Sequence, residues 1–275
     1  MIKTLFVNGC SWTEGHMLHL DPEVHKLSRE QGYVINDVFS VFKDNVELWY
    51  PYKEIYNQHN WAGVIARELD ISNIVNHAVG AASNDRILRT TVDYVKRLTE
   101  QEKQETFVVI GWSIPDRNEI YLNDKNGKAA WCSWNATQKF SSVERIHDPE
   151  FIKRMDKFWE LYVVDVFDWH PSIQKFFQQS YLLATLLEHH KIKYYFFNSF
   201  SPLFGITDYV PYLEHFKHDI DTYNNEITAM SMNTDFFNFI GDNTDLHLPD
   251  RHPNKLGHTM WGNHLLEDMK QQGII

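Results

Sequence analysis

Residues near the two ends of the chain have the side chains that a serine-based acyl transfer requires. Ser11 follows the short apolar segment 2–8, which is long enough for one buried strand. A serine just beyond a strand end lies where the backbone turns sharply and exposes the hydroxyl, as a nucleophile requires. Such a serine needs a base, a group that orients the base, and donors for the oxyanion. We therefore treat Ser11 as a candidate nucleophile, although a serine that only caps the next helix has the same pattern.

The segment 248–258 near the C-terminus supplies a candidate base, His252, with Asp250 two residues before it. A carboxylate beside a histidine fixes the tautomer that can accept a proton, so we expect Asp250 to orient His252. A Ser-His pair assisted by a backbone carbonyl is the simpler alternative. Weaker alternatives are Asp242 or Asp245 as the acid, and His170 of the similar segment 168–171, with its Asp168, as the base.

Two segments in the middle of the chain offer donors for an oxyanion. Gly80 follows the apolar segment 74–78, and a residue without a side chain permits close approach of its backbone amide. Ser113 follows a second apolar segment and could donate from its hydroxyl, while Asn84 could donate an amide from a helix start. The carboxyl ends of parallel strands meet at one edge of a sheet, so these loops should converge near Ser11.

Arg86 and Arg117 lie just beyond two of these loops. The guanidinium fork of either residue could bind a carboxylate or another anionic group of a substrate. The alternative is a surface ion pair of each arginine with its neighbour, Asp85 or Asp116.

These segments together resemble the SGNH (GDSL-like) hydrolase superfamily. The first block has the form Gly-x-Ser-x-Thr-x-Gly, with Gly9, Ser11, Thr13 and Gly15. Three segments, Gly-Cys-Ser-Trp-Thr, Gly-Ala-Ala-Ser-Asn-Asp-Arg and Gly-Trp-Ser, are most similar to SGNH-like proteins of phage genomes. The resemblance implies a flavodoxin-like fold, a serine esterase or deacylase activity, no metal and no cofactor. It also implies that the Gly80 amide donates to the oxyanion.

The sequence departs from the family pattern in two places. The acid of the family stands three residues before the histidine, where this chain has Pro249. The third block of the family is Gly-x-Asn-Asp, whereas residues 111–114 read Gly-Trp-Ser-Ile and lack the asparagine. Ser113 or Asn84 would have to replace that oxyanion donor.

The elements that must position these residues follow from apolar periodicity. Strands are expected at 2–8, 74–78, 106–110 and 193–198, with a last short strand at 236–240, and helices at 61–69, 85–98, 151–167, 173–190 and 257–270. Ser83 or Asn84 should cap the second helix. This alternation predicts an α/β fold, a three-layer sandwich around a mostly parallel sheet. We expect one domain over residues 1–275 with insertions at about 16–60 and 112–150, and residues 111–150 read as irregular.

Composition narrows the class of protein. Hydrophobic residues make up 43% of the 275, and the formal charge of −11 disfavours binding to nucleic acid or anionic membranes. Two cysteines and no long apolar run favour a reduced, cytoplasmic protein without a membrane span. If the protein is encoded by a phage, that compartment would be the cytoplasm of the host. No metal-binding motif occurs among the 15 histidines.

We therefore expect a serine hydrolase that cleaves a small O-acyl ester, with a small-molecule or carbohydrate substrate such as an O-acetylated sugar. Two alternatives stay open: a non-catalytic binding or structural protein with this fold, and an acyltransferase that uses the same serine. The oligomeric state does not follow from the sequence.

Overall fold

A parallel sheet forms the centre of the computed structural model, which describes residues 1–30, 50–123, 129–134, 149–163, 168–200, 227 and 230–275. In this part of the chain the sheet has five strands in the order β2-β1-β3-β6-β7, and each neighbouring pair is parallel. The strands are β1 (Thr4–Gly9), β2 (Asn73–Asn76), β3 (Thr106–Trp112), β6 (Lys193–Asn198) and β7 (Met230–Asp235). Counted within the sheet this is the flavodoxin-like order 2-1-3-4-5, which confirms the expected fold class.

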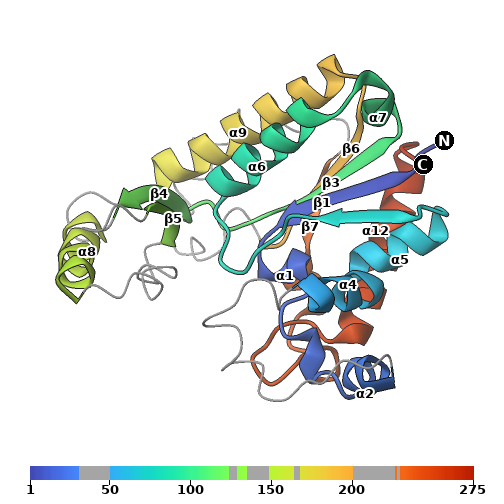
Figure 1. The fold of residues 1–275 in the computed structure, drawn as a ribbon, viewed down its shortest axis with the longest axis horizontal. Coiled ribbons are helices and arrows are strands. Elements are labelled where there is room, and N and C mark those ends of the chain that lie inside the picture. The colour runs from blue at the N-terminus through green and yellow to red at the C-terminus, as the bar shows by residue number, and fades with distance from the viewer. Residues whose placement is uncertain (31–49, 124–128, 135–148, 164–167, 201–226, 228–229) are drawn as a thin grey trace.

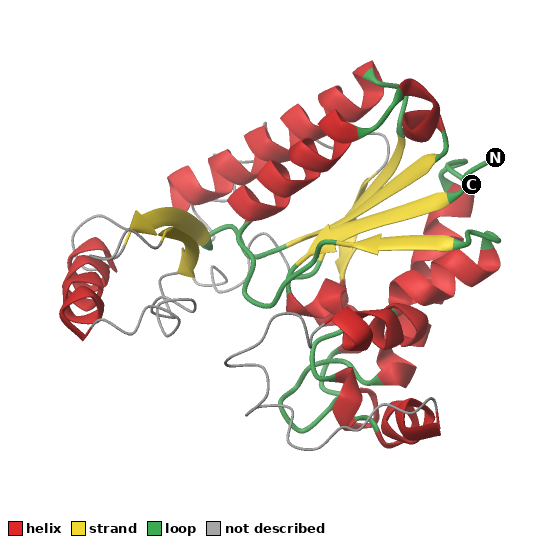
Figure 2. Ribbon diagram, in the orientation of Figure 1, coloured by secondary structure: helices red, strands yellow, loops and turns green. Residues whose placement is uncertain are grey.

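Alternation of side chains along the strands produces two cores, one on each face of the sheet. Phe107 and Val109 of β3 belong to one apolar cluster, and Val108 and Ile110 belong to the other. The helices α5 (Trp61–Glu68) and α12 (Lys255–Gln271) cover the first face, and α6 (Asn84–Arg97) and α9 (Trp169–His189) cover the second. Figures 1 and 2 show the resulting three layers. A strand covered on both faces is apolar throughout, which is why residues 106–110 gave a continuous signal.

The last strand lies earlier in the chain than expected. Residues 236–240 form the short helix α11 (Phe236–Ile240), and the strand is β7, directly before it. Asp235 ends the strand and caps the helix, because its carboxylate accepts from the Asn238 amide at 2.8 Å. A five-residue segment with four apolar residues suits a buried strand or a helix equally well, and here the Asp235 cap favours the helix.

The insertion after β3 is also more regular than expected. Residues 111–150 include an antiparallel hairpin of β4 (Asn118–Asn123) and β5 (Ala129–Trp134), while 135–148 lie outside the described residues. The expected insertion at 16–60 contains η1 (Leu18–Leu20), α2 (Pro22–Glu30) and α4 (Tyr50–His59), with 31–49 outside the described residues. The other elements are α1 (Ser11–Glu14), α7 (Glu100–Gln104), α8 (Pro149–Leu161) and η5 (Thr244–Leu246).

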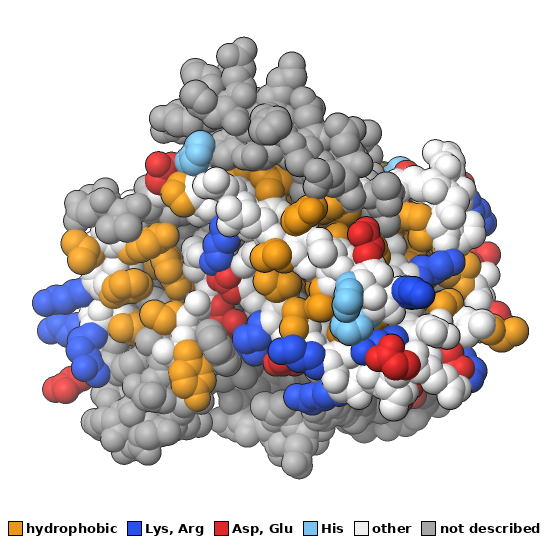
Figure 3. Space-filling model, turned by 90° about the horizontal axis from the view of Figure 1, so that it is seen from above, with side chains coloured by type: hydrophobic (Ala, Val, Ile, Leu, Met, Phe, Trp, Pro, Cys, Tyr) orange, Lys and Arg blue, Asp and Glu red, His pale blue; other side chains and the backbone are white. Residues whose placement is uncertain are grey.

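The surface over α9 carries mixed charge. Figure 3 views the molecule from that side, and basic and acidic side chains are interspersed there. None of the helices in the described residues combines the length and the apolar character that a membrane crossing requires.

Candidate active site

Ser11 begins the four-residue helix α1, directly after the end of β1. Cys10, a buried free thiol, precedes it in extended conformation, and Gly15 closes the helix with a left-handed φ of 80°. The Thr13 hydroxyl packs into space that two glycines leave open. A Cβ added to Gly9 would lie 2.2 Å from Thr13 Oγ1, and one added to Gly111 would lie 2.3 Å from it. The turn is therefore pressed against β3, which fixes the position of Ser11 at the carboxyl edge of the sheet.

Asp250 and His252 contact each other through two hydrogen bonds. Asp250 Oδ2 lies 2.9 Å from His252 Nδ1, and Asp250 Oδ1 accepts from the His252 backbone amide at 3.1 Å. Arg251 between them has a left-handed φ of 67°, and its amide donates to the Leu248 carbonyl at 2.9 Å. This tight turn brings the carboxylate back to the imidazole across a spacing of two residues.

The His252 ring lies beside the turn that holds Ser11. Its centroid is 6.4 Å from the ring of Trp12 and 5.0 Å from the ring of His16. The structure describes both Ser11 and His252, and within its described residues no hydrogen bond joins them. Proton transfer between them would require the Ser11 and His252 side chains to come closer than in this structure.

Gly80 lies next to Ser11, and its amide already has an acceptor. A Cβ on Gly80 would be 3.9 Å from Ser11 Cβ, which is an ordinary contact distance. The Gly80 amide donates to Glu14 Oε2 at 2.8 Å, and that carboxylate is buried. Sequence reasoning missed Glu14, whose only signal was an acidic residue three positions after the serine. For Gly80 to serve an oxyanion, Glu14 has to release this amide.

Asn84 and Ser113, the candidates for the missing third-block asparagine, bind each other. The Ser113 amide donates to Asn84 Oδ1 at 2.8 Å, and Asn84 Nδ2 donates to the Ser113 carbonyl at 3.1 Å. Asn84 therefore holds the Ser113 backbone in place, and Ser83 is the residue that caps α6. The Ser113 hydroxyl accepts from Arg117 Nη1 at 2.9 Å, so its own hydrogen is available to another acceptor.

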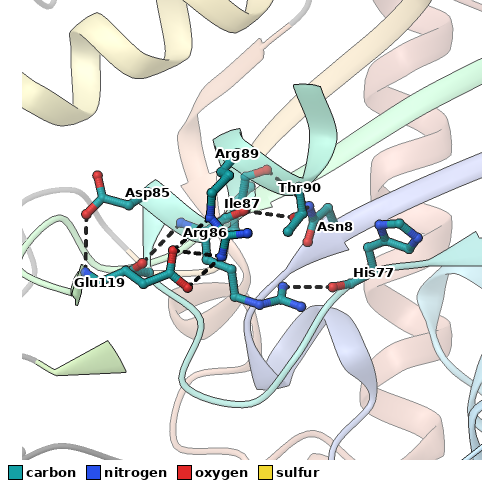
Figure 4. A network of polar contacts seen from close by, with 9 residues as sticks. Asn8, His77, Asp85, Arg86, Ile87, Arg89, Thr90 and Glu119 are labelled. Carbon is teal, nitrogen blue, oxygen red and sulfur yellow. Dashed lines mark hydrogen bonds and ion pairs between the residues drawn. The ribbon is translucent and has the colours of Figure 1, made fainter. Parts of the chain in front are cut away.

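Arg86 belongs to a polar network at the start of α6 (Figure 4). Its Nη1 donates to the His77 carbonyl at 2.9 Å, and burial lowers the pKa of its guanidinium while the charge of Glu119 opposes that change. Its neighbour Asp85 bonds Lys175 Nζ at 2.8 Å, and among the described residues no ion pair joins Arg86 to Asp85, which was the alternative for this arginine. In the same network Arg89 donates hydrogen bonds to both carboxylate oxygens of Glu119. These contacts give Arg86 a structural role in this network.

The segment 168–171, which like 250–253 reads Asp-x-His-Pro, starts a helix on the other face of the sheet. Asp168 caps α9 by accepting from the His170 amide at 2.9 Å, and α9 packs in the core opposite to that of Trp12. Of the substitute acids, Asp242 and Asp245 are exposed, and neither has a described contact with His252. Asp250 is the acid that reaches the imidazole.

His258, six residues after the candidate base, is fully buried beside Phe236, with ring centroids 5.4 Å apart. Neither ring nitrogen has a hydrogen-bond partner among the described residues. Burial first, and the nearby His252 second, lower the pKa of His258 to about 3. It is therefore a neutral core residue at ordinary pH. No group of three or more His, Cys, Asp or Glu side chains in the described residues is arranged to hold a metal ion.

A family of unknown function, DUF6071, matches residues 43–274, which is most of the chain. The chain belongs to this family. The match contains the loops of Gly80, Ser113 and His252 and begins after the Ser11 turn. A comparison of this DUF6071 chain with curated proteins finds no match.

Several solved structures are similar to this DUF6071 chain at low identity. The psychrotrophic esterase EstA of a Pseudoalteromonas species is 10% identical with a TM-score of 0.47, and the alignment covers 99% of this chain and 98% of that one. TesA is 12% identical with a TM-score of 0.44, covering 99% and 100%. A member of the lipolytic G-D-S-L family from Veillonella parvula is 9% identical with a TM-score of 0.41, covering 98% and 99%.

Proposed function

We propose that this protein is a serine ester hydrolase in which Ser11 is the nucleophile, His252 the base and Asp250 the group that orients the base. The observation that supports this best is the 2.9 Å contact between Asp250 Oδ2 and His252 Nδ1. An ionised carboxylate only accepts hydrogen bonds, so beside it a neutral imidazole would carry its hydrogen on Nδ1 and keep the lone pair on Nε2. This is the tautomer that a general base needs.

In the proposed reaction Ser11 Oγ attacks the acyl carbonyl while His252 takes its proton. The tetrahedral oxyanion would receive hydrogen bonds from the amides of Ser11 and Gly80 and from the Ser113 hydroxyl. Collapse of the tetrahedral intermediate breaks the ester bond, and His252 gives its proton to the leaving alcohol. Water, with His252 again as the base, then attacks the acyl-enzyme, which releases the carboxylic acid and restores Ser11. Each missing donor typically costs about 10²–10³ in rate, so a hydroxyl in place of the family asparagine predicts slow turnover.

The acyl group in this proposal is small, such as the acetyl of an O-acetylated carbohydrate. Ser11 is only 9% exposed, and a side chain at position 80 would already contact it, which leaves little room beside the nucleophile. The sugar is suggested by the superfamily that the sequence resembles, many of whose members remove acetyl groups from sugars.

A binding role without catalysis is the second candidate. It is favoured by the engagement of the Gly80 amide with Glu14 and by the lack of a Ser11–His252 hydrogen bond within the described residues. A carboxylate held where an oxyanion would bind is what an inactive site would contain.

Hydrolysis of 4-nitrophenyl acetate separates the two candidates. We expect slow turnover that falls to background in Ser11→Ala and by at least about 10³-fold in His252→Ala, since these residues act as one unit. Turnover that rises when an alcohol acceptor is added would indicate an acyltransferase. Folded protein without Ser11-dependent turnover would contradict the hydrolase and leave the binding role.

A further inference from the structure

Arg86, Arg89 and Arg117 lie near the start of α6 and in the loop after β3, and Arg117 differs from the other two in its charge environment. Arg89 forms a two-pronged ion pair with Glu119, at 2.9 Å to each oxygen from Nη2. Arg86 is bonded to a backbone carbonyl and lies in the field of the same Glu119. Arg117 forms no ion pair with any described carboxylate; its described contacts are a hydroxyl and an aromatic ring.

These two contacts link Arg117 to one proposed oxyanion donor, Ser113, and to the aromatic ring of Phe200. Its Nη1 holds the Ser113 hydroxyl at 2.9 Å, and its guanidinium carbon lies 5.7 Å from the centroid of the Phe200 ring. Phe200 in turn packs on Trp12, the neighbour of Ser11, with ring centroids 5.2 Å apart. Phe200 therefore connects the cation to the turn that carries the nucleophile.

Within the described part of the chain, the Arg117 guanidinium has few hydrogen-bond acceptors. A guanidinium has five N–H donors in a flat fork, and only one contact, to Ser113, is made within the described residues. Its Nε is buried and has no acceptor there, although Arg117 as a whole is half-buried. A buried donor without an acceptor is destabilising, more so when it belongs to a charged group, and an anionic oxygen would satisfy it.

We infer that Arg117 binds a carboxylate or phosphate group on the alcohol part of the ester substrate; this inference rests on the proposed hydrolase function. The acyl part is small and lies at Ser11, so the charge belongs on the leaving alcohol. The formal charge of −11 repels anions at distance, which means that only a local contact of this kind would select them. An acetylated sugar acid or sugar phosphate has the chemistry that this site would recognise.

The test compares anionic and neutral acetates that are otherwise alike. The substrates are 4-acetoxybenzoate and 4-acetoxyphenyl phosphate, each against the neutral methyl 4-acetoxybenzoate. We expect the wild-type kcat/KM to be higher for one of the anionic esters, and the preferred anion identifies the group. Arg117→Gln should lower the ratio of anionic to neutral kcat/KM by about 10- to 100-fold, as expected for losing a charged hydrogen bond. The ratio cancels any loss through Ser113, which affects both esters alike.

Two further variants serve as controls. Arg117→Lys keeps the charge and should retain part of the preference. Arg97→Gln removes an exposed charge from the last turn of α6 and should leave the ratio within about twofold. A wild type without preference for either anion, or an unchanged ratio in Arg117→Gln, would overturn the inference.

A binding measurement separates this inference from the hydrolase proposal. Calorimetric titration of Ser11→Ala protein with 4-hydroxybenzoate and with phenyl phosphate should detect binding that weakens at least about tenfold in Ser11→Ala/Arg117→Gln. Arg117-dependent binding without any turnover in the wild type would reject the hydrolase and keep the anion site. Ser11-dependent turnover of neutral ester without such binding would reject the anion site alone.

Discussion

Asp250 and His252 form a two-point contact across a single intervening residue, with Asp250 Oδ2 at 2.9 Å from the ring and Oδ1 at 3.1 Å from the backbone amide of His252. The left-handed Arg251 helps to make this possible, because it lies in the turn that reverses the chain over residues 248–252. Non-glycine residues adopt this conformation at some cost, so the turn requires support from its surroundings. The Leu248 amide provides part of it by donating to the His252 carbonyl at 2.7 Å.

Replacing the acid tests the role of this contact. In Asp250→Asn the amide can donate to Nδ1 and stabilise the wrong tautomer, so kcat should fall by about 10³- to 10⁴-fold while the fold is kept. The matched control is Asp168→Asn, in the similar segment, where asparagine caps a helix as well as aspartate does and turnover should not change. Aryl acetate kinetics and thermal melting of both variants provide the comparison. Unchanged kcat in Asp250→Asn would show that Ser11 and His252 work without this acid.

Two glycines at the same edge should respond differently to alanine. In Gly111→Ala the new Cβ would meet Thr13 Oγ1 at 2.3 Å and the Phe197 ring at 2.7 Å, so we expect a loss of stability of about 1–3 kcal/mol. In Gly80→Ala the nearest atoms lie at 3.6–3.9 Å, so the fold should persist. That methyl group would stand against Ser11 and obstruct the acyl carbonyl, so turnover should fall at least about tenfold. Denaturant unfolding measures the first effect and ester hydrolysis the second. Full activity in Gly80→Ala would contradict the assignment of Gly80 to the active site.

Glu14 competes with an oxyanion for the Gly80 amide. Glu14→Gln keeps an acceptor for that amide and removes the charge, so it should weaken this hydrogen bond and favour a developing oxyanion. We expect faster phosphonylation of Ser11 together with a loss of stability of about 1 kcal/mol. Slower phosphonylation in a folded variant would mean that the Glu14 carboxylate assists the reaction.

The stability of the protein should depend on pH through His258. Its pKa is about 3 when folded and 6.5 ordinarily, so below pH 6.5 the unfolded chain binds a proton that the folded protein does not. The free energy of unfolding should therefore fall by about 1.4 kcal/mol per pH unit from this residue as the pH decreases from 6.5 toward 3. His258→Phe loses no described hydrogen bond and should show an acid slope that is smaller by about one proton. Equal slopes in urea unfolding of both proteins would contradict the buried, neutral state.

The sequence predicted the sheet better than it predicted the contacts at the site. Residues 106–110 indicate a clear strand because both faces are buried, whereas the strand predicted at 236–240 is wrong because a short, mostly apolar segment fits either element. The Asp250–His252 contact could be predicted from the sequence because the two residues are close together in the chain. The Glu14–Gly80 and Asn84–Ser113 hydrogen bonds join residues 66 and 29 positions apart, and only the folded sheet edge brings them together.

Labelling with a fluorophosphonate tests the central claim most directly, because the reaction needs an accessible serine, a base and oxyanion donors together. We predict one phosphonyl adduct per chain by intact mass, located on Ser11 by peptide mapping. The adduct should be absent in Ser11→Ala and formed far more slowly in His252→Ala. Folded wild-type protein that remains unlabelled, or labelling that persists in Ser11→Ala, would contradict the assignment of Ser11 as an activated nucleophile.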